Sequence, residues 1–248
     1  MDVVIEQYFE LELMRDEFGF VLDGFFETLQ LSLVSGVLAL AWGLVLALLR
    51  QMPGRALAPV RFVTIAYIDA FRGVPLLLVV LIISGSLPFV AEGLGLPRSV
   101  GIPQWLGKPD PFWYGAFAIT ITYGAYMAEV YRAGIEGVPG GQMEAARALG
   151  MSHGQAMRNV IVPQAVRRVI PPLLNDFIAL MKDTSLVGVI ALLEVVEAGR
   201  TVQAETLNSS ALTLGALMFL AVTLPLARAV DRLIARQQLR FERGVAPA

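Results

Sequence analysis

The sequence predicts an all-α protein, a polytopic membrane bundle of five transmembrane helices. Hydrophobic residues make up 56% of the 248 residues and charged residues only 16%, whereas soluble domains carry about 25% charged residues. Five segments are also mostly apolar over about the 20 residues that a helix needs to cross a membrane. Five buried helices of a soluble protein would show similar runs, but the chain has too little polar surface to cover them.

The N-terminal segment, residues 1–23, is predicted to be an amphipathic lead-in on the outer side of the membrane. Residues 1–27 hold eight acidic residues against one basic residue, Arg15. A secretory signal peptide begins with basic residues and then turns apolar. We therefore do not expect this segment to be removed.

The predicted spans are about 24–49, 62–91, 111–132, 169–193 and 206–228. Gly73 and Pro75 are expected to break the second span near its middle. The fourth span is interrupted by charges and carries tandem prolines, Pro171 and Pro172, which a helix tolerates near its start. We predict one membrane domain, about 24–232, followed by a cytoplasmic tail, 233–248.

Arginine and lysine residues are distributed unevenly among the predicted loops. Four of them lie in the N-terminal segment, the 92–110 loop and the 194–205 loop, whereas thirteen lie in the 50–61 loop, the 132–168 segment and the C-terminal tail. Short cytoplasmic loops carry the excess of basic residues in membrane proteins. We therefore predict the N-terminus outside and the C-terminus in the cytoplasm, as five spans require.

The predicted cytoplasmic loop, 133–168, has the sequence of a helical hairpin. Pro139 can open a helix, residues 142–149 favour a helix, and Gly150 can supply a left-handed C-terminal cap. Ser152 and Gln155 have the spacing of a capping box that starts a second helix. So short a first helix needs a surface to pack against, either on its own subunit or on a partner protein.

This hairpin resembles the EAA loop of type I ABC importer permeases. Glu144-Ala145-Ala146 is followed at the family's spacing by Gly150 and by Val160-Ile161-Val162-Pro163, in which valines replace the isoleucine and leucine of the usual Ile-x-Leu-Pro ending. In that family the loop forms a coupling helix that sits in a cleft of the cytoplasmic ATPase. The resemblance implies that coupling to the ATPase rests on Glu144, Ala145, Ala146, Gly150 and Pro163.

Four further segments are similar to the polar amino-acid permeases of that class, which take up histidine, glutamine, arginine and glutamate. The segments are 67–76, 125–135, 182–186 and 224–228. Ala133 departs from the pattern, which has glycine at that place. Together with the hairpin, these segments extend the resemblance over about 24–236.

The resemblance implies a multi-pass permease subunit of an importer in a bacterial inner membrane. Its expected partners are ABC ATPase subunits that hold ATP and Mg²⁺, a second permease that is identical or homologous, an extracytoplasmic amino-acid-binding protein, and the lipid bilayer. The chain itself would hold no cofactor and bind no nucleic acid. The alternatives are a permease of this class for another small solute, an ion-coupled secondary transporter and a non-transporting membrane scaffold.

Charged residues inside membrane spans are costly and usually face the bundle interior or a water-filled path. Asp69 and Arg72 stand three residues apart, as do Glu129 and Arg132, so that each pair can meet on one helix face. Such charges either hold the bundle together or line a path that suits an amino acid, which carries both signs. The candidate path residues are Asp69, Arg72, Glu129, Asp176, Lys182, Asp183, Thr184 and Ser185. Neutralising Lys182 or Asp183 should then lower uptake more than assembly.

Several functions are excluded by what the chain lacks. It has no cysteine and one histidine, His153, which excludes thiol chemistry, disulfides and a His/Cys metal site, but not a metal bound by carboxylates alone. It has no G-x-x-x-x-G-K-[ST] motif, so it is not predicted to be the ATPase. It also lacks the H-E-x-x-H motif of metallohydrolases. We therefore predict a transport subunit without catalytic or metal-binding residues of its own.

Overall fold

The computed structural model describes the backbone of residues 2–95 and 107–245, and these residues form helices joined by short turns, without a strand. The predicted all-α class is thus confirmed for the described part of the chain. Residues 96–106 of the predicted outer loop lie outside the described residues.

The chain begins with two short helices, α1 (Asp2–Phe9) and α2 (Leu11–Asp16). They are tied to the far end of the sequence, because the Ser209 N–H donates to the Gln7 carbonyl at 2.9 Å and the Asn208 amide donates to the Glu6 carbonyl at 2.9 Å. The predicted N-terminal lead-in is therefore helical and docked on the turn before the last helix.

The long helix α3 (Phe18–Arg50) packs along α6 (Asp110–Glu136). The two backbones approach closely, because a Cβ added to Gly43 would lie 2.8 Å from the Cβ of Met127 and 2.9 Å from the Gly124 carbonyl oxygen. Helix α6 also contacts α4, α5 and α9. It therefore forms the centre of the bundle.

The predicted second span consists of two helices, α4 (Ala58–Gly73) and α5 (Leu76–Gly93). Between them Val74 is extended, with φ −96° and ψ 131°. Pro75 directly precedes α5 and cannot donate a backbone hydrogen bond to the preceding turn. The predicted break at Gly73 and Pro75 is confirmed.

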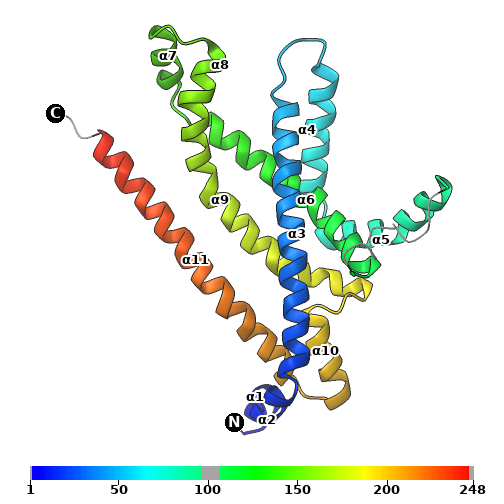
Figure 1. Ribbon diagram of the computed structural model, residues 1–248. Helices are drawn as coiled ribbons and strands as arrows, with labels where there is room; N and C mark the ends of the chain where they lie inside the picture. The colour runs from blue at the N-terminus through cyan, green and yellow to red at the C-terminus, as the bar shows by residue number, and fades with distance from the viewer. Residues whose placement is uncertain (1, 96–106, 246–248) are drawn as a thin grey trace.

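The helical hairpin predicted within residues 133–168 is also confirmed (Figure 1). Helix α7 (Gly140–Ala148) begins after Pro139, and Gly150 is left-handed with φ 82°. Helix α8 (His153–Ala156) begins with a capping box in which Ser152 and Gln155 exchange side-chain and backbone hydrogen bonds. A short π-helix, η2 (Met157–Ile161), then leads directly into α9 (Val162–Asp183).

The helix expected over residues 169–193 differs from the prediction in two respects. Helix α9 begins at Val162, not near residue 169, so Pro171 and Pro172 lie inside the helix and not near its start. The α-helix also ends at Asp183 and continues only as a 3₁₀-helix, η3 (Thr184–Ile190). The sequence signal was ambiguous because Asp176, Lys182 and Asp183 interrupt the apolar run by which a span is recognised.

The remaining helices are α10 (Val195–Thr206) and α11 (Ser210–Val245). We expected residues 194–205 to form a loop, but Glu194 caps a helix there by accepting hydrogen bonds from the N–H groups of Val196 and Glu197, both at 2.9 Å. A side-chain cap of this kind stabilises the first turn of a helix. Helix α10 packs against α3 and α11.

Three described helices are long and apolar enough to cross a membrane: Phe18–Arg50, Leu76–Gly93 and Ser210–Ala235. The span count of five stays a prediction. Figure 1 shows α7, α8 and the α3–α4 turn at one end of the molecule, with the C-terminal end of α11 toward the same side. Helices α1, α2 and α10 lie at the opposite end. The loops rich in arginine thus gather at one end of the bundle.

Candidate functional site

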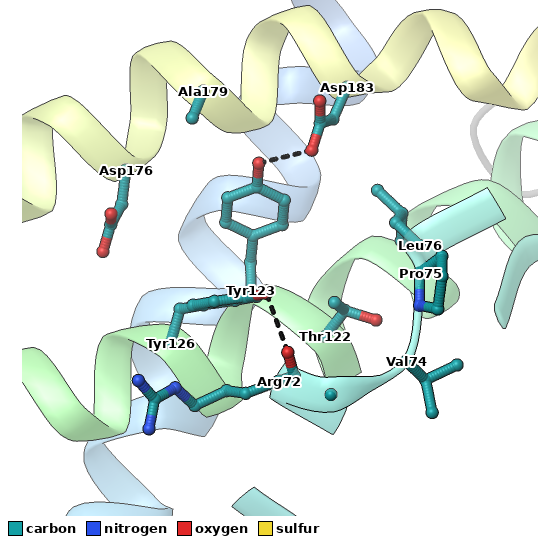
Figure 2. Close-up of a pocket in the computed structure, with 11 residues that line it drawn as sticks. Arg72, Val74, Pro75, Leu76, Thr122, Tyr123, Tyr126, Asp176, Ala179 and Asp183 are labelled. Atoms are coloured by element: carbon teal, nitrogen blue, oxygen red, sulfur yellow. Dashed lines mark hydrogen bonds between the residues drawn. The ribbon is translucent and has the colours of Figure 1, made fainter. Parts of the chain in front are cut away.

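A cavity of about 380 Å³ lies where the α4–α5 break meets α6 and α9 (Figure 2). It is lined by Arg72, Gly73, Val74, Pro75, Leu76, Thr122, Tyr123, Tyr126, Asp176, Ala179 and Asp183. The break in the second span therefore forms one wall. A broken helix at membrane depth is tolerated where protein or water satisfies the backbone groups that the break exposes.

The cationic side of the cavity comes from the end of α4. The Tyr126 hydroxyl donates to the Arg72 carbonyl at 3.2 Å and so satisfies one of the exposed backbone groups. The Arg72 guanidinium carbon lies 5.8 Å from the centre of the Tyr126 ring, which is cation–π range. Figure 2 shows Arg72 and Tyr126 side by side, across the cavity from α9.

The expected ion pair between Asp69 and Arg72 is not formed in the described part of the chain. Both residues are exposed, and Arg72 lines the cavity whereas Asp69 does not. A spacing of three places two side chains near one helix face, but α4 ends at Gly73, directly after Arg72. The tyrosine ring of α6 takes the position beside the guanidinium.

The acidic side of the cavity comes from α9. Asp183 accepts a hydrogen bond from the Tyr123 hydroxyl at 2.7 Å. One carboxylate oxygen of Asp176 is buried and has no hydrogen-bond partner among the described residues. A buried carboxylate oxygen left without a partner is costly. A cationic group in the cavity would supply one.

Of the eight predicted path residues, the cavity brings together Arg72, Asp176 and Asp183. Lys182 is exposed and does not line it. The hydroxyls of Thr184 and Ser185 donate to the carbonyls of Met181 and Lys182, each at 2.7 Å, and so close the end of α9. These two hydroxyls therefore satisfy backbone carbonyls at the end of α9 and are not directed to the cavity by any hydrogen bond in the described residues.

Glu129 belongs to an ion-pair network outside the cavity. Its expected pair with Arg132 is formed at 2.7 Å, and Arg50 of α3 also pairs with it. Arg132 reaches Glu136 as well. The network joins the C-terminal ends of α3 and α6. Of the two roles that the sequence left open for the Glu129–Arg132 pair, the structure thus shows the one that holds the bundle together.

Sequence reasoning missed Thr122, Tyr123 and Tyr126. All three line the cavity from α6. The available signal was a pair of tyrosines three residues apart in an apolar span, a spacing that puts both rings on one helix face. Buried tyrosines usually have a hydrogen-bond partner for the hydroxyl.

The hairpin α7–α8 packs on its own subunit by one face and is exposed on the other. Ala146 is 3% exposed, and Val138, Ile161 and Ala165 form a small core beneath the hairpin. Glu144, Ala145, Gly150 and Pro163 are exposed. Leu149, which the sequence analysis did not single out, is 80% exposed at the tip. An exposed leucine beside small side chains leaves room for a partner surface.

Residues 39–239 match the family described as "Binding-protein-dependent transport system inner membrane component". The chain is 35% identical over 237 residues to the probable glutamine ABC transporter permease protein GlnM of Bacillus subtilis, covering 93% of this chain and 99% of that protein. It is 36% identical over 185 residues to the glutamate/aspartate import permease protein GltK of Escherichia coli O157:H7, covering 74% of this chain and 77% of that protein.

The fold is also similar to a solved structure, "Crystal structure of an amino acid ABC transporter with histidines". The TM-score is 0.75 at 30% sequence identity, and the match covers 90% of this chain and 96% of the other.

Proposed function

This chain belongs to the family of binding-protein-dependent transport system inner membrane components, and we propose that it is the permease through which an ABC importer moves polar amino acids into the cell. The relatives named for glutamine and for glutamate and aspartate support this solute class. The observation that carries the proposal is a cavity that holds Arg72 on one side and Asp176 and Asp183 on the other.

A polar amino acid fits the charges of this cavity. Its ammonium group would meet the unpartnered oxygen of Asp176, and its carboxylate would meet the guanidinium of Arg72. Hydrogen bonds between charged groups are stronger than those between neutral groups. Transport requires that such contacts be weak enough to release the solute, and the exposed position of Arg72 in this chain suits that requirement.

The partners follow from the two ends of the bundle. The exposed face of α7, with Glu144, Ala145 and Leu149, would contact an ATPase subunit that holds ATP and Mg²⁺. The end with α1, α2 and α10 would face an extracytoplasmic amino-acid-binding protein (Figure 1). A second permease, identical or homologous, would complete the path. The N-terminus, at α1, would lie outside the cell, and the C-terminus, at the end of α11, would lie in the cytoplasm.

The proposal is tested by reconstituting the permease with its ATPase and its binding protein in proteoliposomes. We expect uptake of a labelled polar amino acid that requires ATP inside the vesicle and stops when the ATPase is inactivated. Histidine, glutamine, arginine and glutamate form the test panel. Uptake that persisted on an ion gradient without ATP would contradict the importer and favour a secondary transporter.

Variants of two neighbouring charged residues test whether the charged cavity is part of the transport path. Asp183→Asn should lower uptake with the complex still assembled, because Asp183 lines the cavity. Lys182→Gln should change uptake less, because Lys182 is exposed and lies outside the lining. Collapse of assembly in Asp183→Asn would instead assign Asp183 a structural role through its bond to Tyr123.

A further inference from the structure

A second cavity of about 310 Å³ lies between α3, α5 and α6 and shares no residue with the charged one. It is lined by Leu38, Leu87, Trp113, Tyr114, Ala116, Phe117 and Thr120. None of these side chains carries a charge. Leu38 is 45% exposed and Phe117 is 46% exposed, so the cavity opens through an apolar rim. We call it the apolar groove.

The helices around the apolar groove are apolar. Leu38 and Leu87 belong to α3 and α5, two helices that are long and apolar enough to cross a membrane. A polar amino acid would find no charged partner there. An occupant must therefore be largely hydrocarbon, and the hydrocarbon that surrounds a membrane helix is the acyl chain of a lipid.

One polar group at the groove indicates which end of a lipid binds. The indole N–H of Trp113 is buried and has no hydrogen-bond acceptor among the described residues. Buried tryptophan N–H groups usually find a partner, and tryptophan is enriched where membrane meets water. Trp113 stands in the first turn of α6, at the start of the predicted third span. Ester carbonyls of phospholipids lie at that level and accept hydrogen bonds.

Thr120 and Thr122 are the two described threonines whose hydroxyls are buried without a hydrogen-bond partner, and Thr120 is the one that lines the apolar groove. Thr64 and Thr201 donate to the carbonyls four residues before them, at 2.8 and 2.9 Å, but the buried Thr120 hydroxyl has no partner among the described residues. It lies seven residues beyond Trp113, about 10 Å farther along the helix at 1.5 Å per residue. A lipid with its ester at Trp113 would place hydrocarbon beside Thr120.

We propose that the apolar groove binds one phospholipid, with an acyl chain between α3, α5 and α6 and an ester carbonyl accepting the Trp113 N–H. This inference goes beyond the transport function and does not rest on the charged cavity. The competing occupant of the groove is a side chain from the second permease, which the test separates from lipid.

The test counts phospholipids that remain on the purified transporter complex, using native mass spectrometry in detergent. Leu38→Trp should fill the groove and remove about one phospholipid per permease. Leu33→Trp is the matched control, because Leu33 lies on the same helix, is 61% exposed and does not line the groove. This control should retain the wild-type number.

Two further variants remove the polar groups at the groove and test the hydrogen bond. Trp113→Phe should weaken phospholipid retention about fivefold, as expected for one lost hydrogen bond, whereas Thr120→Val should retain lipid at least as well as the wild type. An unchanged lipid count in both Leu38→Trp and Trp113→Phe would overturn the proposal. Separation of the two permeases by Leu38→Trp with no loss of lipid would overturn it in favour of a permease contact. ATP-driven uptake, measured in parallel, reports on the transport function alone.

Discussion

Asp176 and Asp183 are both carboxylates of α9 that line the charged cavity, yet their surroundings differ. Asp183 accepts a hydrogen bond from Tyr123, whereas Asp176 has a buried oxygen without a partner among the described residues. An unsatisfied buried acceptor is expensive, and the ammonium group of the proposed solute would supply the missing donor. We therefore expect replacement of Asp176 to distinguish a solute-binding role of the charged cavity from a purely structural role.

Replacing Asp176 tests this at the residue scale. Asp176→Asn should lower uptake by about tenfold or more, because a hydrogen bond to a charged group contributes about 1.5–3 kcal/mol. Uptake in proteoliposomes is the measurement. Asp69→Asn is the control, since Asp69 is exposed and lies outside the cavity. Equal uptake by both variants would remove Asp176 from the path.

The burial of Glu194 predicts that the stability of the folded protein depends on pH. It lies outside the predicted spans, caps α10 and is fully buried. Burial raises the pKa of Glu194 from its ordinary value of 4.5 to about 7, although its hydrogen bonds from Val196 and Glu197 act in the opposite direction. The folded protein then holds this proton to higher pH than the unfolded chain does. Stability should therefore fall as the pH rises from about 4.5 to about 7 and level off above.

The variant Glu194→Gln, which cannot titrate, should flatten this part of the curve. The predicted fall in the free energy of unfolding is on the order of 3 kcal/mol, since one unit of pKa corresponds to about 1.4 kcal/mol. Thermal unfolding of the detergent-solubilised protein at a series of pH values measures it. A wild-type slope that survives in the variant would assign the pH dependence to another group.

At the scale of elements, two interruptions of helices shape the charged cavity and the exposed face of α7. The extended Val74 between α4 and α5 opens a wall of the charged cavity. The left-handed Gly150 turns the chain between α7 and α8, so that one face of α7 packs on its own subunit and the other is exposed. In each case the backbone leaves the helix where we propose that a ligand or partner approaches.

We predict that replacing Gly150 weakens the contact between the hairpin and the ATPase subunit. Gly150→Ala should destabilise the hairpin by about 1–2 kcal/mol, because a Cβ is disfavoured at its φ of 82°, and the complex should retain less ATPase on purification. Gly154→Ala is the matched control, since Gly154 lies within α8 and a Cβ there would meet nothing within 4 Å. Equal ATPase retention in both variants would show that the turn does not position α7.

At the scale of the whole molecule, the basic loops gather at one end of the bundle (Figure 1). Helix α7 and the α3–α4 turn lie at that end, and α10 lies at the other. In a membrane protein the basic end faces the cytoplasm. The fold and the charge distribution therefore support one orientation.

Single cysteines can map this orientation without background, because the chain has no cysteine. Glu205→Cys, at the exposed end of α10, should react with a membrane-impermeant maleimide in intact cells. Gln51→Cys, exposed in the α3–α4 turn, should react only after the membrane is opened. The reverse pattern would invert the predicted topology.

Features that are local in the sequence were predicted correctly. The hairpin follows from Pro139, Gly150 and the Ser152–Gln155 capping box, because caps and turns depend on a few neighbouring residues. The break at Gly73 and Pro75 has the same origin. Where local signals conflicted, as in the charged run around Asp176 or the capped helix after Glu194, the predicted boundaries were wrong.

The sequence by itself determined that the chain is a helical membrane bundle with a basic end and a helical hairpin, because composition, charge distribution and caps are properties of the chain read along its length. Only the tertiary structure decided which charges meet. Arg72 lies beside Tyr126 and not in an ion pair with Asp69, and it lines one cavity with Asp176 and Asp183. Such pairings depend on how helices from distant parts of the chain pack and rotate against one another, which spacing within one helix does not specify.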